Sequence, residues 1–388
     1  MISPLQSIRV LDLSRLLPGP YCTMFLADFG AEVIKIEELH LGDYARLGEP
    51  KLGTDSAIFS SLNRNKKSIT IDLKSEKGKE IFLELVKTAD VLVESFRPGV
   101  MERLGLGYET LKALNPKLIY CAITGYGQTG PYAKLPGHDL NYISYAGLLD
   151  LQGERNRKPV APSVQIADIG GGSLMAVTGI LLAIQARNIN GKGQFVDISM
   201  LDGAVSWLQT TLPNYLTNHQ LPTRGELPLS GEKACYEVYE TLDHRYLAVG
   251  ALEYKFWAEF CKAIKREDLI DSLDAPKNIQ DELKIEIGNI IKKKPLDEWT
   301  EIFNHYEACV SPVLTFEEMV NHPQLKNRKM IQEIPGMIGK QIGIPIKLSD
   351  TPGSIYKNAP KLGENNQEIL EELGIRKKKE KGKSEEVI

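Results

Sequence analysis

Three segments near the N-terminus decide the fold: Ile8-Arg-Val-Leu-Asp-Leu13, Pro18-Gly-Pro20 and Glu32-Val-Ile-Lys-Ile-Glu37. The first and third are short runs of strand length. Residues 21–29 between them have the composition of a helix that ends at Gly30. A strand, a helix and a strand in close succession form a βαβ unit, in which the strands are parallel and the crossover is right-handed. The N-terminal part of the chain is therefore predicted to be an α/β domain.

The same alternation continues to residue 217 and predicts a large, Rossmann-like domain with a parallel sheet. We expect further strands at 68–73, 90–93, 117–123 and 194–199, and helices at 76–88, 100–114, 173–187 and 200–216. The strand at 117–123 is almost continuously apolar, as expected for a strand that is buried on both faces. Neither a dinucleotide-binding glycine motif nor a P-loop follows the first strand, so we reject a nucleotide-binding function of those two kinds.

A second, smaller domain is predicted after a polar linker. Residues 218–232 contain two prolines and two glycines, which is typical of a linker. Residues 233–330 predict an α+β domain, with a hairpin followed by helices. Residues 331–375 become extended again and end in a helix, and residues 376–388 form a charged tail that is expected to be disordered.

Composition narrows the functional classes. The chain of 388 residues is 42% apolar and 25% charged, as in an ordinary globular protein. Its net charge of −4 gives no electrostatic reason to expect nucleic acid or an anionic membrane as a partner. We identify no apolar run of the ~18 residues that a membrane span needs, and no signal peptide. Because the five cysteines form neither a metal nor a disulfide pattern, we expect a cytoplasmic location.

Two residues that can carry protons lie in glycine-rich segments of the large domain. His138 lies within Gly137-His-Asp-Leu-Asn-Tyr142, and Asp168 precedes three glycines and a long apolar helix. Taken singly, the histidine is an ordinary surface or core residue, and the aspartate is best explained as a helix cap. The alternative is a catalytic pair with glycine N–H groups nearby as donors for an oxyanion. These residues alone leave both explanations open.

Basic residues occur in three predicted sheet loops, at Arg46, at Asn63-Arg-Asn-Lys-Lys67 and at Arg97. Loops beyond the carboxyl ends of parallel strands bind ligands, and cations in them clamp polyphosphates. From spacing alone, however, plain surface charge is the simpler explanation. Glu253 follows a predicted hairpin strand and is, by itself, an ordinary surface carboxylate.

Over nearly its whole length, from residue 8 to residue 374, the sequence resembles the family III CoA-transferase superfamily. The resemblance rests on several segments together: Val10-Leu-Asp-Leu-Ser-Arg15, Ala27-Asp-Phe-Gly-Ala-Glu-Val-Ile-Lys35, Gly42-Asp43 with Arg46, Asn63-Arg-Asn-Lys66, Phe96-Arg-Pro-Gly99, residues 120–131, Gly191-Lys-Gly-Gln194 and Ala359-Pro-Lys-Leu-Gly363. Within the superfamily, Gly137-His138-Asp139 is similar to the racemase members, because the transferases typically have phenylalanine in place of the histidine.

The resemblance implies racemisation of 2-methylacyl-CoA thioesters, in which the α-proton is removed on one face of the carbon and returned on the other. His138 and Asp168 would be the two proton carriers, and Glu253 of the partner subunit would support His138. The alternative is CoA transfer between carboxylic acids through an anhydride on Asp168, which needs no histidine. A non-catalytic acyl-CoA-binding protein is a third hypothesis.

The resemblance also implies how the substrate and a partner subunit bind. Residues expected to contact CoA are Arg46, Asn63, Arg64, Lys66, Arg97, Tyr126 and Asp139. An interlocked homodimer is expected, in which the C-terminal segment returns to the large domain. No metal or separate cofactor is expected, since CoA is part of the substrate. Asn365 stands where the family often has histidine, a departure that we expect to be structural.

Overall fold

The computed structural model describes residues 2–375, and the chain divides into two compact units. The first comprises the described parts of Met1–Ala146, Ser163–Trp207 and Pro323–Ile388, and the second comprises Gly147–Pro162 and Leu208–His322. The predicted charged tail, residues 376–388, lies outside the described residues.

These boundaries differ from the predicted ones in two places. Residues 147–162 and 208–217 belong to the second unit, although we expected them in the large domain, and residues 323–330 belong to the first. Two ion pairs join residues 147–162 to the predicted linker: Arg155 pairs with Glu226 at 2.6 Å, and Arg224 pairs with Asp150. These contacts connect two segments that are distant in the sequence, so composition alone does not predict them.

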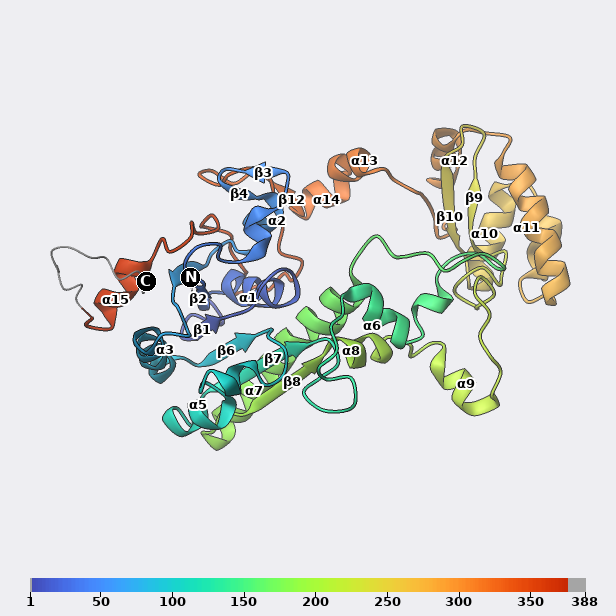
Figure 1. Ribbon diagram of the computed structural model, residues 1–388. Coiled ribbons are helices and arrows are strands. Elements are labelled where there is room, and N and C mark those ends of the chain that lie inside the picture. Colours follow the sequence, from blue (N-terminus) through green and yellow to red (C-terminus); the bar gives the residue numbers. More distant parts are fainter. Residues whose placement is uncertain (1, 376–388) are drawn as a thin grey trace. The chain divides into compact units, whose positions relative to one another are not determined.

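A six-stranded parallel sheet forms the first unit and confirms the predicted α/β fold (Figure 1). Its strands are β1 (Arg9–Asp12), β2 (Glu32–Glu37), β5 (Lys67–Thr70), β6 (Val91–Glu94), β7 (Ile119–Thr124) and β8 (Phe195–Ser199). They lie in the order β5-β2-β1-β6-β7-β8, so the direction in which strands are added reverses between β1 and β6. In open α/β sheets, ligands bind beyond the carboxyl ends of the strands at such a reversal.

Helices pack on both faces of this sheet. They are α1 (Pro18–Asp28), α3 (Glu76–Thr88), α4 (Val100–Arg103), α5 (Tyr108–Leu114), α6 (Asp139–Tyr145), η3 (Ile166–Leu174), α7 (Met175–Asn190), α8 (Met200–Ser206) and α15 (Asn366–Glu372). Leu11 and Leu13 point to the face that α3, α5 and α15 cover, in one core with Phe82 and Ile369. Val10, directly before Leu11, is buried on the opposite face, where α1 and α7 pack together.

Most predicted elements of the first unit are confirmed, but two predicted helices are broken. The helix expected at 100–114 is two helices, α4 and α5, interrupted at Gly105-Leu-Gly107. The helix expected at 200–216 stops at Ser206, and α9 follows as part of the second unit. The remaining short elements of the first unit are η1 (Tyr44–Leu47), β3 (Lys51–Leu52), β4 (Asp55–Ser56), α2 (Ala57–Leu62), α14 (Pro323–Asn327), β12 (Ile331–Gln332) and β13 (Gln341–Ile342).

The C-terminal segment bonds to β5, the edge strand of the sheet. Asn365 Oδ1 accepts the N–H of Ser68 at 3.0 Å, and Asn366 Oδ1 accepts the N–H of Thr70 at 2.9 Å. These bonds satisfy backbone groups that an open edge would leave free for unwanted pairing. Asn365, the departure from the family pattern, therefore has a structural role.

The second unit is an α+β structure built on a three-stranded antiparallel sheet. The central strand β10 (Tyr246–Gly250) lies between β9 (Tyr236–Glu240) and β11 (Val310–Pro312). Trp257, Phe260 and Ile287 pack against this sheet in a single core. The other elements are η2 (Leu149–Leu151), α9 (Leu212–Asn218), α10 (Tyr254–Ala263), η4 (Glu267–Ser272), α11 (Lys277–Ile291), α12 (Leu296–Phe303) and α13 (Phe316–Asn321).

Within residues 2–375, one helix is long and apolar enough to cross a membrane by length and composition, contrary to our expectation that no segment is. It runs from Ile166 to Asn190 through η3 and α7, and its most apolar window has a mean hydropathy of 1.7 and is 44% buried. Helices inside a protein core meet the same two criteria. This one packs against α1, α8 and β8 and carries Asp168.

Glu94, the last residue of β6, is a buried carboxyl group. It is 5% exposed, and its Oε2 accepts the N–H of Phe96 at 2.6 Å. Burial raises the pKa of Glu94 to about 8; the N–H of Phe96 and the Tyr120 hydroxyl oppose the rise, and the carboxylates of Glu102 and Asp197 add to it. The folded protein therefore holds a proton here that the unfolded chain releases at a lower pH.

We expect Glu94 to make folding stability decrease as pH rises from about 5 to about 8. In this window the native state binds more protons than the unfolded state, so the free energy of unfolding falls with pH. Glu94→Gln keeps an acceptor for Phe96 and a donor for Tyr120 without a charge. It should raise the urea midpoint at pH 8 more than at pH 5.5. An equal change at the two pH values would contradict this account.

Candidate active site

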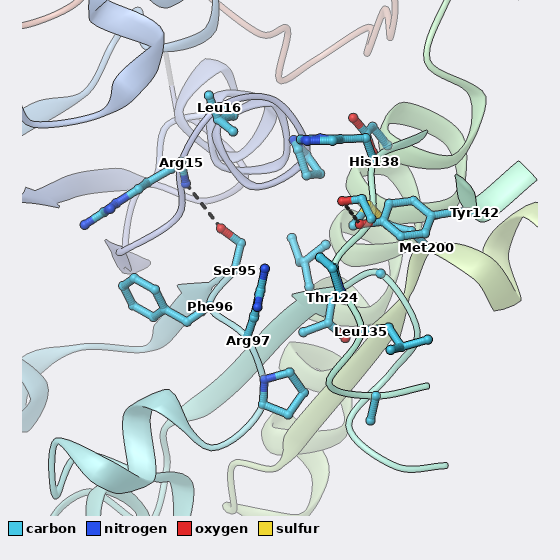
Figure 2. Close-up of a pocket in the computed structure, with 18 of the residues that line it drawn as sticks. Arg15, Leu16, Ser95, Phe96, Arg97, Thr124, Leu135, His138, Tyr142 and Met200 are labelled. Atoms are coloured by element: carbon cyan, nitrogen blue, oxygen red, sulfur yellow. Dashed lines mark hydrogen bonds between the residues drawn. The ribbon is translucent and has the colours of Figure 1, made fainter. Parts of the chain in front are cut away.

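A cavity of about 730 Å³ lies beyond the carboxyl ends of β1, β6 and β7, where the strand order reverses (Figure 2). The segment after β1 contributes Arg15 and Leu16, and the segment after β6 contributes Phe96 and Arg97. From β7 onward the lining residues include Thr124, Leu135, His138, Asn141, Tyr142, Asp168 and Met200. The cavity therefore occupies the position in which this sheet topology is expected to bind a ligand.

His138 is held at the cavity by the first turn of α6. Its N–H donates to Asn141 Oδ1 at 3.1 Å, and its carbonyl accepts the N–H of Asn141 at 2.8 Å. Its backbone is extended, with φ −129 and ψ 173, and its side chain is exposed. The imidazole is thus free to meet a ligand in the cavity.

Asp168 reaches the same cavity from η3, which is a π-helix. Single π-helical turns occur often at functional sites, because they re-aim side chains within a helix. The Asp139 carboxylate fixes the first turn of η3: its Oδ1 accepts the N–H groups of Ala167 at 2.7 Å and of Asp168 at 3.0 Å. Two predicted site residues, Asp139 and Asp168, are therefore in direct contact, with Asp139 as the support.

The environment of Asp168 makes its carboxyl group a weaker acid than an ordinary aspartate side chain. Burial raises the pKa of Asp168 to about 6; the Asp139 carboxylate adds to this increase and His138 opposes it. A carboxyl group with a pKa near 6 exists in both protonation states close to neutral pH, as general acid–base catalysis requires.

The three glycines after Asp168 serve helix packing, which corrects the expectation that they admit a ligand or face an oxyanion. All three are buried. A Cβ atom at Gly170 would lie 2.6 Å from the Trp207 ring, and one at Gly171 would lie 2.6 Å from the carbonyl oxygen of Met200. The glycines therefore let η3 approach α8 closely, and this packing holds the turn that carries Asp168.

Arginine side chains surround the other side of the cavity. Arg15, Arg97 and Arg103 line it, and within residues 2–375 no ion pair joins any of them to a carboxylate. Figure 2 shows Arg15 and Arg97 on one side, with His138 and Tyr142 on the other. A second cavity of about 490 Å³ shares Arg15 with the first and reaches the ends of β2 and β5. In the same range, no three His, Cys, Asp or Glu side chains form a group that could hold a metal ion.

Two of the arginines expected to contact CoA are instead buried in ion pairs. Arg46 is 5% exposed and bonds to both carboxylate oxygens of Glu37, at 2.8 and 2.6 Å. Arg64 is 2% exposed and bonds to both oxygens of Asp28, at 3.1 and 2.7 Å. Bidentate pairs of this kind occupy the guanidinium donors that a phosphate would need. Neither residue faces the cavity, so we assign both a structural role.

Asn63 and Lys66, from the same predicted cluster, are also structural. Lys66 is fully buried, and its Nζ donates to Thr23 Oγ1 at 2.7 Å, to Asn63 Oδ1 at 2.9 Å and to Asp12 Oδ2 at 3.1 Å. Burial lowers the pKa of Lys66 to about 8, although the Asp12 carboxylate opposes the change. Asn63 is likewise 0% exposed. Residues 63–66 of the cluster are therefore buried and structural, while Lys67 is 28% exposed and pairs with Glu32 and Glu368.

The remaining predicted residues lie in three different places. Arg97 lines the cavity, and its contact with CoA stays a prediction. Tyr126 is buried in an aromatic cluster, with its ring centroid 5.2 Å from that of Tyr142, and is not among the lining residues. Glu253 is an exposed residue directly before α10, in the second unit. Its support of His138 stays a prediction.

Sequence reasoning did not single out Arg15, Arg103 or Tyr142 as site residues. For Arg15 a signal exists, because it follows β1 directly and the segments after parallel strands gather at one edge of the sheet. Arg103 ends the short helix α4, and nothing local distinguishes it from a surface arginine. Tyr142 lies within the quoted histidine segment, but its contacts appear only in the folded structure.

Comparison with known proteins shows the family to which the chain belongs. The model of CoA-transferase family III matches residues 5–366, and the chain belongs to this family. The chain is 38% identical to the human "Alpha-methylacyl-CoA racemase" (96% of this chain, 94% of the relative). It is 37% identical to an "Acyl-CoA transferase" of Fusarium pseudograminearum (96% and 85%). The crystal structure of a CAIB/BAIF family protein from Brucella suis is similar, with a TM-score of 0.83 and 31% identity over 96% of this chain and 100% of that one.

Proposed function

We propose that this chain racemises 2-methylacyl-CoA thioesters, interconverting the (R) and (S) forms. The observation that carries the proposal is that His138 and Asp168, two groups able to carry protons, line one cavity together. Membership of the family supports an enzyme that acts on CoA thioesters. The two relatives differ by only one per cent in identity, so the choice of reaction rests on the residues of the site.

In the proposed mechanism the α-carbon of the thioester lies between the two carriers. One carrier takes the α-proton, and the C–H electron pair moves into the thioester carbonyl to give an enolate. The other carrier then returns a proton to the opposite face of the same carbon. An imidazole and a carboxyl group with a pKa near 6 can each accept and donate a proton near neutral pH, so the pair works in both directions.

The CoA part of the substrate would bind on the arginine side of the cavity. Arg15, Arg97 and Arg103 have their guanidinium groups free of carboxylates within the described range, and arginine binds phosphate with paired N–H donors. Arg15 and Arg103 thus join Arg97, which the sequence already predicted, and take the place of Arg46 and Arg64 as the proposed phosphate contacts. Leu135 and Met200, which also line the cavity, would contact the acyl chain.

The alternative function is CoA transfer, with Asp168 as the nucleophile. Asp168 lines the cavity and the acyl-CoA transferase relative is nearly as similar as the racemase. Such a mechanism forms an anhydride between Asp168 and the acyl group and releases the CoA thiolate. The thiolate attacks the Asp168 carbonyl and frees the donor acid, and the acceptor carboxylate then displaces CoA from this aspartyl thioester to form a second anhydride. Attack of the thiolate on the acceptor's acyl carbonyl gives the new thioester and regenerates Asp168. It gives His138 no proton to move, and for that reason we favour racemisation.

We further propose that the enzyme works as a homodimer in which Glu253 of one subunit supports His138 of the other. The first unit exposes apolar side chains on α7, where Leu182 is 66% and Ile189 is 79% exposed. A second copy of the chain would cover such a face. Sedimentation velocity at micromolar concentration tests this: a monomer at every concentration would contradict it.

The proposed function is tested by incubating an enantiopure 2-methylacyl-CoA with the intact protein, with and without a free carboxylic acid. After hydrolysis, chiral chromatography gives the configuration of the acyl group. We expect equal amounts of both enantiomers without any acid present, for at least one chain length in a small panel. Movement of CoA to the free acid with retained configuration would instead establish the transferase.

Asp139→Asn should shift the acidic limb of the kcat/KM profile to lower pH. The Asp139 carboxylate raises the pKa of Asp168, and asparagine removes this charge while its Oδ1 can still accept the N–H groups of Ala167 and Asp168. The pKa of Asp168 should therefore fall, so its base form persists at lower pH. Values of kcat/KM measured between about pH 4.5 and 8 test this expectation. A shift of the acidic limb to higher pH would contradict the role of Asp168 as a proton carrier.

A further inference from the structure

Tyr142 is a buried hydroxyl group of the cavity that the proposed mechanism does not use. It is 6% exposed and lies on α6, one turn after His138. Its hydroxyl donates to the carbonyl oxygen of Gly137 at 2.5 Å (Figure 2). That carbonyl belongs to the peptide group directly before His138.

The ring of Tyr142 is held in place by two glycines. A Cβ atom at Gly125 would lie 2.4 Å from Tyr142 Cε1, and one at Gly137 would lie 2.6 Å from the same atom. Any side chain at either position would displace the ring. Tyr126 meets the ring edge to face, with centroids 5.2 Å apart. The tyrosine therefore fits tightly between the end of β7 and the histidine segment, which fixes the direction of its hydroxyl group.

The peptide between Gly137 and His138 is bonded at both of its polar atoms. Tyr142 binds its carbonyl oxygen, and Asn141 Oδ1 accepts its N–H at 3.1 Å. Both side chains come from α6. Because a peptide group is planar, fixing its oxygen and its N–H fixes its orientation, and with it the direction of the bond to the Cα of His138. Asp168 has a separate support, the Asp139 carboxylate.

We propose that Tyr142 is a positioning residue for His138: with Asn141 it clamps the Gly137–His138 peptide and so aims the imidazole at the substrate. This inference rests on the proposed function, because aiming matters only if His138 moves a proton. Tyr142 would therefore affect proton transfer by His138 and not proton transfer by Asp168. A displacement of about 1 Å in a catalytic group costs on the order of 10²-fold in rate.

The test compares wild type with Tyr142→Phe, which keeps the ring and removes the hydroxyl. Solvent-deuterium exchange at the α-carbon is measured separately for the two enantiomers of one 2-methylacyl-CoA. We expect exchange through His138 to fall by about 10- to 100-fold, exchange through Asp168 to stay within about threefold, and KM to change little. Equal losses for both enantiomers, or no loss, would overturn the proposal.

Tyr145→Phe is the matched control, because Tyr145 contacts the same aromatic cluster but is 56% exposed and does not line the cavity. It should change neither exchange rate. Asn141→Ala removes the other half of the clamp, so it should reproduce the face-selective loss even if Tyr142→Phe folds poorly. In the double variant that combines Tyr142→Phe with Asn141→Ala, the exchange rate should fall by less than the product of the two single fold-losses.

A readout without substrate separates this inference from the proposed function. The chain has six histidines, so the imidazole C–H resonances are few, and the His138 signal is the one missing in His138→Ala. We expect Tyr142→Phe to shift or broaden that signal and to leave the other five unchanged. An unchanged His138 signal would overturn the clamp whatever the activity. Wild type without exchange at either enantiomer would instead refute the proposed function.

Discussion

Replacing His138 with alanine should lower racemisation of a 2-methylacyl-CoA by about 10²–10⁴-fold, the usual contribution of one positioned proton carrier. Exchange of the α-proton with solvent should nevertheless continue for one enantiomer. Asp168 still removes the proton from the face that it meets and returns a deuteron to that same face. The remaining exchange therefore proceeds without inversion, and mass spectrometry combined with chiral separation detects it.

A His138→Ala protein that loses exchange of both enantiomers while still binding the thioester would contradict separate carriers. A protein that racemises at the wild-type rate would remove His138 from the mechanism. His138 is exposed and lies outside the described cores, so its replacement should leave the fold intact. Unchanged thermal unfolding checks this.

Asp168→Asn should produce the complementary defect. Asparagine has nearly the same shape, and the backbone N–H of residue 168 can still donate to the Asp139 carboxylate, but its side-chain amide neither takes up nor releases a proton near neutral pH. Racemisation should again fall by about 10²–10⁴-fold. The enantiomer that keeps its exchange should be the one that His138→Ala loses, because His138 now acts alone.

The same two variants separate the proposed function from CoA transfer. An anhydride mechanism requires Asp168 and does not require His138. Under that mechanism Asp168→Asn abolishes transfer to a free acid, while His138→Ala leaves it largely intact. A hydroxylamine-sensitive intermediate in wild type that Asp168→Asn lacks would be further evidence for transfer. Loss of exchange at the same enantiomer in both variants would also contradict the racemase assignment.

The sheet of the first unit was predictable because each strand is a short apolar run with turn residues on both sides. Ile119–Thr124, for example, is buried at every position and is apolar at nearly every one. The unit boundaries were not predictable, because residues 147–162 contact segments that are distant in the sequence, as the ion pair of Arg155 with Glu226 illustrates. The apolar helix from Ile166 to Asn190 was underestimated because Asp168 and the three glycines after it interrupt the hydrophobic run.

Local chemistry alone left His138 and Asp168 open between a structural and a catalytic explanation. The resemblance to the family assigned both residues to the site, and both do line one cavity. The basic cluster was misjudged because a sequence does not show which cations meet buried carboxylates. Lys66 pairs with Asp12 and Arg64 with Asp28, and in both pairs the partner belongs to a distant segment. Arg103, which lines the cavity, looks locally no different from these, whereas the position of Arg15 shortly after β1 is a signal.

The most direct test of two proton carriers is deuterium incorporation by the wild-type protein in D₂O, from one pure enantiomer of a 2-methylacyl-CoA and without any carboxylic acid acceptor. We predict that every inverted molecule carries one deuterium at its α-carbon, because the returning proton comes from a carrier that exchanges with solvent. Inverted product without deuterium would contradict the proposal that one carrier removes the proton and a second carrier, which exchanges with solvent, returns one. Substrate that neither inverts nor exchanges would contradict the racemase account itself.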